Sequence, residues 1–331
     1  MSQFSDILND FRKNSASQKE KGTKFEELMK RYLTTDPLYA NRFEWVVMWD
    51  EFFARSQLGG RDTGIDLVAL DKMGEYWAIQ CKCYAEDTPV SKADMDSFIS
   101  TSGRRFTDEA GIERSFNQRL VIASTDNWGV NALEVLRSQT TPVNILKLSD
   151  LEAAPVVWKD IYSGKQGEEA RKSKYTLRKH QAQAYNNAMK YYKDHDCGRM
   201  IMACGTGKTF TSLKIAEGIL AHYNLNEETD TILFLAPSIS LVGQTLREWV
   251  HNAERELNPI CVCSDTTVSK KRIEDDGEER VEDLGVPSTT NPKRIFDEWK
   301  KGIEKESSEK ILTVIFSTYQ SQHRVIDMWR R

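Results

Sequence analysis

The stretch Gly59–Tyr84, GGRDTGIDLVALDKMGEYWAIQCKCY, decides the fold of the first half of the chain. It contains two short apolar runs, Ile65–Leu70 and Tyr76–Tyr84, which are rich in the branched and aromatic residues that strands prefer. Between them, Asp71–Gly74 has the composition of a tight turn. We therefore predict two antiparallel strands joined by a hairpin.

Polar side chains interrupt both predicted strands at positions that the hairpin brings together. Side chains alternate between the two faces of a strand, so Gln80 and Lys82 point to the same side. Asp66 lies near the start of the first strand, opposite the end of the second. The hairpin thus predicts that Asp66, Gln80 and Lys82 meet at one edge of the sheet.

A carboxylate, an amide and a lysine in this arrangement suit the hydrolysis of a phosphodiester. That reaction uses a hard cation held by oxygen ligands and a positive group beside the attacking water. Asp66 would supply the carboxylate, and the Gln80 amide oxygen and the Cys81 backbone carbonyl would complete the ligand set, while Lys82 would orient the water. A hairpin with two solvated polar residues is the alternative, which this motif alone leaves open.

The flanking segments predict the rest of a mixed α/β domain. Residues 22–33, GTKFEELMKRYL, have apolar side chains at helical spacing, with Glu26 on the flank of the apolar face. Phe43–Trp49 predicts a first strand. A helix, a strand, a helix and a strand are then predicted at Val90–Gly103, Gln118–Ser124, Gly129–Ser138 and Pro142–Leu146.

This order of elements resembles the PD-(D/E)xK nuclease core, and the pieces GTKFEE, GIDLVA and IQCK resemble its Mrr-like branch over residues 20–148. The resemblance implies a magnesium-dependent DNA endonuclease with a central mixed sheet flanked by helices. It adds Glu26 as a helix carboxylate that helps to bind the metal. Gln80 stands where many members of the superfamily have Asp or Glu, which leaves metal affinity more dependent on Asp66 and Glu26.

A second chemical motif lies at Arg199–Thr209, RMIMACGTGKT, which continues into a predicted helix. In a phosphate-binding loop, glycines let backbone amides turn toward phosphates, the lysine meets the terminal phosphates, and the threonine offers an oxygen to Mg²⁺. Met202 occupies the place of the first glycine in the general pattern GxxxxGK[ST], so the match is partial. The residues expected to bind the nucleotide here are Gly205, Thr206, Gly207, Lys208 and Thr209.

The segments around this loop resemble superfamily 2 helicases. Leu177–Ala184, LRKHQAQA, resembles the segment that reads adenine, with Gln181 as the adenine contact. Thr231–Trp249, TILFLAPSISLVGQTLREW, predicts a strand, a turn and a helix that would meet nucleic-acid backbone. Lys310–Gln322 predicts another buried strand that runs into a Ser-Thr turn, and it resembles a further DNA-contacting segment. The resemblance implies a RecA-like parallel-sheet lobe that binds ATP.

No DExH or DExD string follows Tyr319. A helicase motor needs such a segment to hold magnesium, and a second RecA-like lobe to supply an arginine to the γ-phosphate. We therefore expect an incomplete motor that binds ATP without efficient hydrolysis, in the N-terminal part of a longer enzyme.

The 331 residues are enough for two domains. We expect a nuclease domain at residues 1–160, a linker at residues 161–174 and the helicase lobe at residues 175–331. The linker is predicted because apolar periodicity is lost there and Ser, Gly and charged residues accumulate. A polar stretch at Ser264–Thr290 predicts a surface insertion in the helicase lobe, followed by a helix from Pro292 to about Lys301.

Composition limits the partners. With a net charge of −4, a DNA-binding protein must segregate its basic residues. The six cysteines have no zinc spacing, the N-terminus lacks the apolar core of a signal peptide, and no window approaches a membrane span, so we expect a cytoplasmic protein with no membrane partner. The candidate basic patches, each also compatible with a solvated face, are Arg104-Arg105, Arg171–Lys174 with Arg178-Lys179, and Lys270–Arg272.

An Mrr-like nuclease followed by a superfamily 2 motor resembles the single-chain type ISP restriction-modification enzymes. The resemblance implies a restriction endonuclease coupled to an ATP-dependent translocase on double-stranded DNA, with a second copy as a candidate partner for double-strand cleavage. It places S-adenosylmethionine in a methyltransferase beyond these residues. Type I restriction subunits share both domains and stay an alternative, as do an idle nuclease fold that clamps DNA for a motor and a nucleotide-binding regulator.

Overall fold

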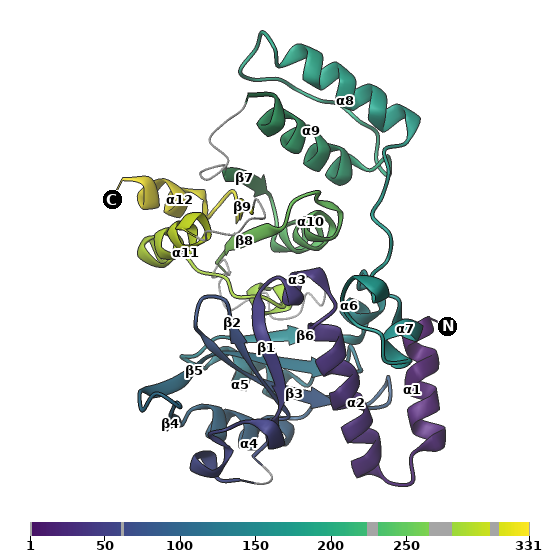
Figure 1. Cartoon of the computed structure of the whole chain (residues 1–331), viewed down its shortest axis with the longest axis vertical. Helices are drawn as coiled ribbons and strands as arrows, with labels where there is room; N and C mark the ends of the chain where they lie inside the picture. Colours follow the sequence, from purple (N-terminus) through teal and green to yellow (C-terminus); the bar gives the residue numbers. More distant parts are fainter. Residues whose placement is uncertain (1, 61–62, 224–230, 265–279, 305–310, 331) are drawn as a thin grey trace. The chain divides into compact units, whose positions relative to one another are not determined.

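The computed structural model describes residues 2–60, 63–223, 231–264, 280–304 and 311–330, and the chain divides into two compact units (Figure 1). Unit 1 comprises Met1–Lys172 together with Glu282–Pro287, and unit 2 comprises Ser173–Val281 and Ser288–Arg331. Unit 1 thus includes a short segment from inside the sequence of unit 2.

Unit 1 is built on a mixed sheet with the order β1-β2-β3-β5-β4, in which β6 also pairs with β5. The β1–β2 and β2–β3 pairs are antiparallel, whereas β3–β5 and β5–β6 are parallel. This confirms the predicted central mixed sheet. The strands are β1 (Phe43–Met48), β2 (Leu67–Asp71), β3 (Tyr76–Lys82), β4 (Arg105–Thr107), β5 (Glu113–Ala123) and β6 (Val143–Leu146).

Helices pack on this sheet and bury their apolar faces against it. α2 packs on β1 and β3, while α4 packs on α5 and β5. The predicted apolar face of α2 is buried, since Phe25 and Leu28 are at most 2% exposed. The helices of unit 1 are α1 (Gln3–Asn14), α2 (Gln18–Leu33), α3 (Pro37–Ala40), α4 (Lys92–Ser102), α5 (Val130–Arg137), α6 (Leu148–Ala153) and α7 (Trp158–Tyr162), with short 3₁₀ turns at Trp49–Glu51, Arg55–Leu58 and Gly167–Ala170.

The predicted hairpin is present. β2 and β3 pair in antiparallel register from Leu67↔Ile79 to Leu70↔Tyr76. The turn between them contains Gly74 with a φ of 80°, a left-handed conformation that glycine adopts without steric cost. The hairpin therefore fixes the end of β3 beside the start of β2, which is where the candidate site lies.

The expected linker at residues 161–174 is folded into unit 1 as far as Lys172. Trp158 is 3% exposed and packs against Phe4 and Tyr32, and the Tyr162 hydroxyl donates to Asp10 Oδ2 at 2.6 Å. Because these aromatic contacts depend on residues far away in the sequence, local composition does not reveal them.

Unit 2 contains a three-stranded parallel sheet in the order β7-β9-β8 among its described residues. α9 packs against α8 and α10, and α10 packs on β7 and β9. The strand and helix predicted for Thr231–Trp249 and the strand predicted within Lys310–Gln322 are confirmed. The elements are β7 (Thr231–Ala236), β8 (Leu257–Val262), β9 (Leu312–Thr318), α8 (Lys179–Tyr191), α9 (Lys208–Tyr223), α10 (Ile239–Asn252), α11 (Pro292–Glu304) and α12 (Gln322–Trp329).

The segment Glu282–Pro287 corrects the predicted surface insertion of the helicase lobe. Its side chains Leu284 and Val286 are at most 1% exposed in unit 1. Its two carboxylates form ion pairs with unit 1, Glu282 with Arg137 at 2.5 Å and Asp283 with Lys147 at 2.8 Å. The polar residues around Leu284 and Val286 make this segment look like an exposed insertion, although the two side chains are buried. Residues 265–279 of the predicted insertion lie outside the described residues.

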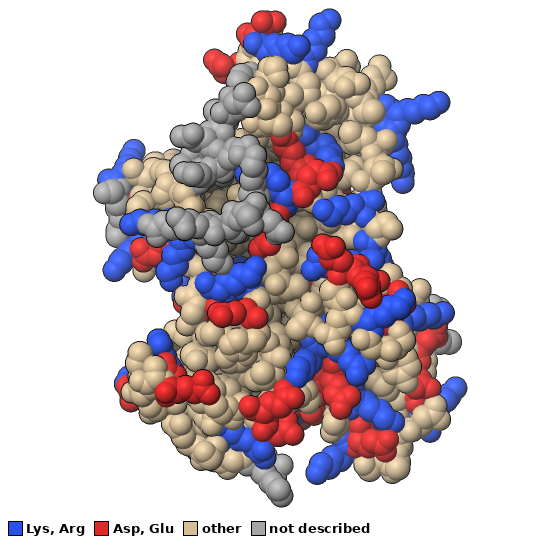
Figure 2. Space-filling view, in the orientation of Figure 1, with Lys and Arg blue, Asp and Glu red and all other residues tan. Residues whose placement is uncertain are grey.

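Charges of both signs are interspersed over the face drawn in Figure 2. The arginines and lysines of the predicted basic patches are mostly engaged within the chain: Arg105 pairs with Glu113 at 2.6 Å, and the Arg171 Nε donates to the Thr35 carbonyl at 2.7 Å. Lys270–Arg272 lies outside the described residues. No helix in the described part of the chain combines the length and apolarity that a membrane span needs.

Candidate active site

Asp66 lies directly before β2 and is fixed between β1 and β3. Its carbonyl accepts the Trp49 N–H at 2.8 Å, and its own N–H donates to the Ile79 carbonyl at 2.9 Å. Its Oδ2 accepts the Cys81 N–H at 2.7 Å. The carboxylate of Asp66 is therefore held against β3, one residue before Lys82.

Glu26 of α2 and Lys82 of β3 share an electrostatic environment with Asp66. Burial raises the pKa of Glu26 to about 7, and the negative charge of Asp66 adds to this effect while Lys82 opposes it. Burial also raises the pKa of Asp66 to about 6, although the Cys81 N–H and Lys82 favour its charged form. The structure thus brings together the two carboxylates and the lysine.

Gln80 occupies the interior of β3 and is only 1% exposed. Its Nε2 donates to the Asp94 carbonyl oxygen at 3.2 Å. Its Oε1 is buried and has no hydrogen-bond partner among the described residues. A buried acceptor without a donor is costly, and such atoms often mark a site for an ion or a water.

Asp94 and Tyr84, which the sequence did not point to, adjoin this site. Asp94 lies in the first turn of α4, where its Oδ2 accepts the Ser91 N–H at 2.8 Å. Its Oδ1 accepts the Tyr84 hydroxyl at 2.5 Å. Burial opposes ionisation of Asp94, but hydrogen bonds from Ser91 and Tyr84 and the charge of Lys82 lower its pKa. The spacing Ser91-x-x-Asp94 is a capping-box pattern that would have located this turn.

These residues fit a magnesium ion by their donor chemistry. Among the described residues, no group of three or more His, Cys, Asp or Glu side chains is placed to hold a metal. Asp66 and Glu26 supply two carboxylates whose pKa values are raised, and Gln80 supplies a buried oxygen without a donor. A divalent cation would relieve the repulsion and satisfy the oxygen, and an all-oxygen set is what Mg²⁺ prefers.

The glycine-rich loop of unit 2 has part of the expected geometry. Gly205 and Gly207 adopt φ values of 75° and 79°, which favour glycine, and the helix predicted after the loop is α9, which begins at Lys208. The apolar run before the loop, however, forms no strand, and Ile201 is 87% exposed. The run that should support the loop is therefore not part of the sheet.

The loop is bonded to groups of its own chain. The Thr206 hydroxyl donates to the Ala203 carbonyl at 2.7 Å, and the Lys208 Nζ donates to the same oxygen at 3.4 Å. Gln181 is 5% exposed, and its Nε2 donates to the Thr206 carbonyl at 3.1 Å while its Oε1 accepts the Arg178 N–H at 2.8 Å. The amide of Gln181 thus contacts the loop, and its role as an adenine contact stays a prediction.

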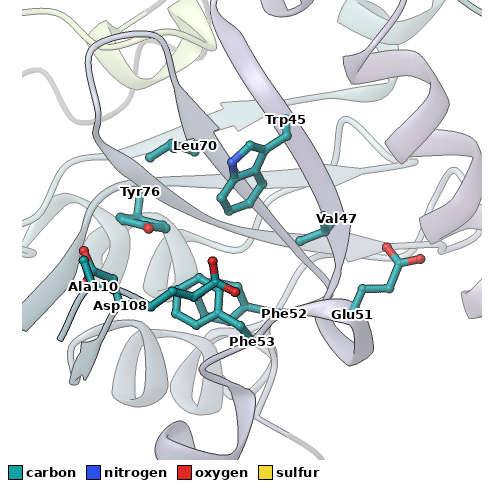
Figure 3. A pocket seen from close by; sticks show the side chains of 10 residues that line it. Trp45, Val47, Glu51, Phe52, Phe53, Leu70, Tyr76, Asp108 and Ala110 are labelled. Atoms are coloured by element: carbon teal, nitrogen blue, oxygen red, sulfur yellow. The ribbon is translucent and has the colours of Figure 1, made fainter. Parts of the chain in front are cut away.

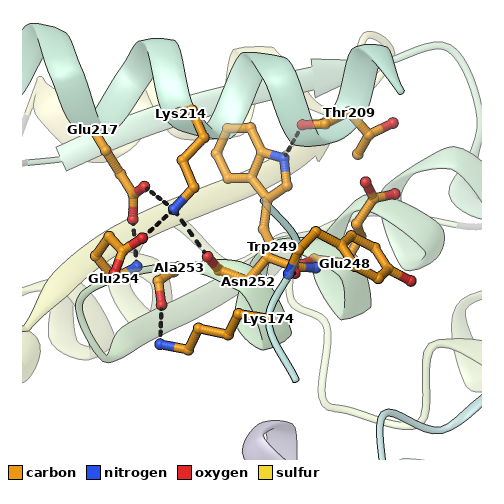
Figure 4. A network of polar contacts seen from close by, with 10 residues as sticks. Lys174, Thr209, Lys214, Glu217, Glu248, Trp249, Asn252, Ala253 and Glu254 are labelled. Carbon is orange, nitrogen blue, oxygen red and sulfur yellow. Dashed lines mark hydrogen bonds and ion pairs between the residues drawn. The ribbon is translucent and has the colours of Figure 1, made fainter. Parts of the chain in front are cut away.

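Lys214 links the helix after this loop to the end of α10 (Figure 4). Its Nζ binds Glu217 Oε2 at 3.0 Å, Glu254 Oε1 at 2.6 Å and the Asn252 carbonyl at 3.2 Å. The Trp249 Nε1 donates to the Thr209 carbonyl at 2.9 Å. The first turns of α9 are therefore fastened to α10 by polar contacts.

A separate pocket of about 530 Å³ lies in unit 1 (Figure 3). Its apolar lining comes mainly from aromatic residues, and acidic residues line it as well. Neither Asp66 nor Lys82 lines it, so it is distinct from the candidate active site. The lining residues are Trp45, Val47, Glu51, Phe52, Phe53, Leu70, Tyr76, Asp108, Glu109 and Ala110.

Each of two parts of the chain matches a protein-family model. Residues 34–168 match the family model described as restriction endonuclease, and residues 174–327 match the model described as type III restriction enzyme, res subunit. A search of curated proteins found no match.

The solved structures that are similar to this chain include two of type ISP enzymes. The ATP-dependent type ISP restriction-modification enzyme LlaBIII bound to DNA matches with 29% identity and a TM-score of 0.75 over 98% of this chain. This chain spans only 19% of the length of that enzyme. A nuclease-deletion mutant of the type ISP enzyme LlaGI, in complex with a DNA substrate mimic, matches 47% of this chain and 14% of its own length at 35% identity, with a TM-score of 0.37. The chain therefore combines a match to a restriction endonuclease model with a match to a res-subunit model, and with this order of domains it is similar to a type ISP restriction-modification enzyme.

Proposed function

We propose that this chain cuts double-stranded DNA with Mg²⁺ and contributes an ATP-binding lobe to a motor that moves along the DNA. The observation that carries the nuclease proposal is the buried Oε1 of Gln80, which has no partner in the described chain and lies on the same strand as Lys82. The adjoining carboxylates of Asp66 and Glu26 have raised pKa values, as expected where a cation normally offsets their charge.

Each residue has a distinct role in this proposal. When bound, Mg²⁺ would polarise the scissile phosphate and acidify a water. Asp66, Glu26 and Gln80 would hold the ion, with the Cys81 backbone carbonyl as a further ligand. The Cys81 N–H keeps the Asp66 carboxylate in one orientation. Lys82 would orient the attacking water and offset the negative charge that develops on the phosphate.

DNA is proposed as the substrate because the similar LlaBIII structure is described as bound to DNA. The nuclease unit would contact the duplex mainly through phosphates, which position a protein without reading sequence. One such site cuts one strand, so a second copy would cut the other.

The proposed ATP site is the loop before α9. Lys208 and Thr209 would meet the phosphates and Mg²⁺, and the amides of Gly205, Thr206 and Gly207 would turn toward the phosphates. Lys208 would then exchange its contact with the Ala203 carbonyl for the nucleotide. The contacts of Lys214 and Trp249 would transmit a change at this loop to α10.

Lys82→Ala tests the nuclease proposal. Plasmid nicking with Mg²⁺ and without ATP should fall by roughly 100-fold or more, because the positive group beside the water is lost. Lys72→Ala, in the turn of the same hairpin but away from the site, is the matched control and should nick like wild type. Equal nicking by both variants would refute the assigned role of Lys82.

A further inference from the structure

One hydrogen bond of Gln80 fixes which end of its amide faces α4 and which end is left without a partner among the described residues. A carboxamide has a donor end and an acceptor end, whereas a backbone carbonyl oxygen only accepts. The Asp94 carbonyl, at 3.2 Å from Nε2, therefore selects the NH₂ end of Gln80. The Oε1 end is left buried and without a donor among the described residues, available to a cation.

The carbonyl that makes this selection is itself held in place. Asp94 accepts three hydrogen bonds through its carboxylate, from the Tyr84 hydroxyl at 2.5 Å, the Ser91 N–H at 2.8 Å and the Ser91 hydroxyl at 2.7 Å. The Ser91 contacts form the capping box at the start of α4. Tyr84 follows β3 by two residues, so its bond ties the first turn of α4 to the end of the strand that carries Gln80 and Lys82.

Burial and the bond to Asp94 raise the pKa of Tyr84, so its hydroxyl remains a donor at neutral pH. Asp94 stays ionised there because its pKa is lowered despite its partial burial. A charged acceptor and a phenol form a stronger and shorter hydrogen bond than two neutral groups.

We propose that Asp94 and Tyr84 are positioning residues for metal binding: they hold the Asp94 carbonyl against the Gln80 amide and so direct Gln80 Oε1 toward the ion. This inference rests on the proposed function, because it assumes that Asp66 and Gln80 bind Mg²⁺. The inference goes beyond the proposed function because it gives a positioning role to two residues that would not touch the ion.

The same geometry explains why glutamine suits position 80. Gln80→Glu would place a carboxylate oxygen, in place of an NH₂ group, against the Asp94 carbonyl, where two acceptors repel each other. The added charge of the glutamate would attract Mg²⁺, but the lost hydrogen bond would release its orientation. We expect Gln80→Glu to bind Mg²⁺ no more tightly than wild type.

The test measures binding of Mg²⁺ alone to the whole chain by titration calorimetry, without DNA or nucleotide. Tyr84→Phe should weaken Mg²⁺ binding by roughly 10-fold, the size of effect typical when an outer partner of a metal ligand is lost. Tyr162→Phe is the matched control, because the Tyr162 hydroxyl also donates to a carboxylate, Asp10 at 2.6 Å, on elements that do not form the site. It should bind Mg²⁺ like wild type, and both variants should lose a similar amount of melting temperature.

Three outcomes separate the possibilities. Weak Mg²⁺ binding in Tyr84→Phe with wild-type binding in Tyr162→Phe supports the inference. Wild-type Mg²⁺ affinity in Tyr84→Phe, or tighter binding in Gln80→Glu, overturns it. Asp66→Ala distinguishes this failure from that of the proposed function: if Asp66→Ala still binds Mg²⁺ like wild type, the assigned metal site itself is wrong.

Discussion

The hairpin of unit 1 and the glycine-rich loop of unit 2 were equally conspicuous in the sequence, but their structures differ. At the hairpin, buried groups are left unsatisfied: Gln80 Oε1 has no donor in the described chain, and Asp66 and Glu26 have raised pKa values. At the loop, Lys208 and Gln181 bond to loop carbonyls, and the preceding Ile201 is 87% exposed.

The difference lies in the sheets that support the two motifs. β3 pairs with β2 as far as Ile79 and with β5 as far as Lys82, so both neighbours fix the register of the strand that carries Gln80 and Lys82. Arg199–Ala203 pairs with no strand in the described part of unit 2, and the carbonyls of the loop accept hydrogen bonds from Gln181 of α8 and Lys208 of α9. A strand that is paired with two neighbours holds its polar and charged side chains in fixed positions, where they can bind a ligand. A loop without that support satisfies its own polar groups.

The largest expected effect is on stability and concerns Glu282–Pro287, the segment of unit 1 that lies between two parts of unit 2 in the sequence. Leu284→Ala removes a side chain that is 1% exposed in unit 1 and should lower the free energy of unfolding of that unit by about 3 kcal/mol. Urea unfolding of the whole chain, followed by tryptophan fluorescence, measures this. Leu241→Ala, at a residue 43% exposed in α10, is the control and should change stability little. An equal small effect in both would contradict the burial of Leu284.

A second prediction separates the two motifs. Lys208→Ala should weaken ATP binding by roughly 100-fold, because the lysine would meet the terminal phosphates, while Mg²⁺-dependent nicking stays at the wild-type rate. Binding of a fluorescent ATP analogue and plasmid nicking on one preparation provide both readings. Lys193→Ala, at an exposed lysine of unit 2, should change neither. Loss of nicking in Lys208→Ala would mean that the two sites are not independent.

The raised pKa values predict a stability cost at the nuclease site when metal is absent. The folded pKa of Asp66 is about 6, above its ordinary value of 3.8, so ionisation destabilises the folded state at pH above 6 and this cost disappears as the pH falls toward 4. Asp66→Asn removes the charge and should stabilise the metal-free protein by about 1–3 kcal/mol at pH 8.

The gain of Asp66→Asn over wild type should shrink at pH 5 and vanish near pH 4. Melting in EDTA across this range checks the prediction. Asp160→Asn, at a partly exposed carboxylate that pairs with Lys165, is the control and should show no such gain at pH 8. Stabilisation of Asp66→Asn that does not depend on pH would have to come from a cause other than buried charge.

The smallest expected effect tests the unsupported run before the loop. Ile201→Ser should change the free energy of unfolding by less than about 0.5 kcal/mol, because the side chain is 87% exposed. Ile315→Ser in β9, at 1% exposure, should cost several times more. A large cost for Ile201→Ser would show that the run is buried in solution.

The sequence allowed prediction of those features that depend on local pattern. Alternation placed Gln80 and Lys82 on one face, and the turn composition at Asp71–Gly74 gave the hairpin. The helix with Glu26 followed from apolar spacing, although the role of Glu26 came from a family resemblance. In the structure, Glu26 and Lys82 influence each other's electrostatic environment together with Asp66.

Other features could not be predicted from the sequence because they depend on contacts between residues that are distant in it. Nothing near Leu284 indicates that it is buried against residues more than a hundred positions earlier, since its neighbours are acidic. Trp158 and Tyr162 were candidates to anchor part of the expected linker to one domain, but their partners Phe4 and Asp10 lie far away in the sequence and could not be identified from it. The role of Asp94 was hidden because its backbone carbonyl, rather than its side chain, binds Gln80.

Plasmid cleavage by Asp66→Ala across a Mg²⁺ titration, without ATP, tests the account most directly. Wild type should nick the plasmid in proportion to bound Mg²⁺, and Asp66→Ala should remain inactive at every Mg²⁺ concentration while it still binds the plasmid in EDTA. Cleavage by Asp66→Ala at the wild-type rate would contradict the claim that this hairpin is the metal-dependent nuclease site.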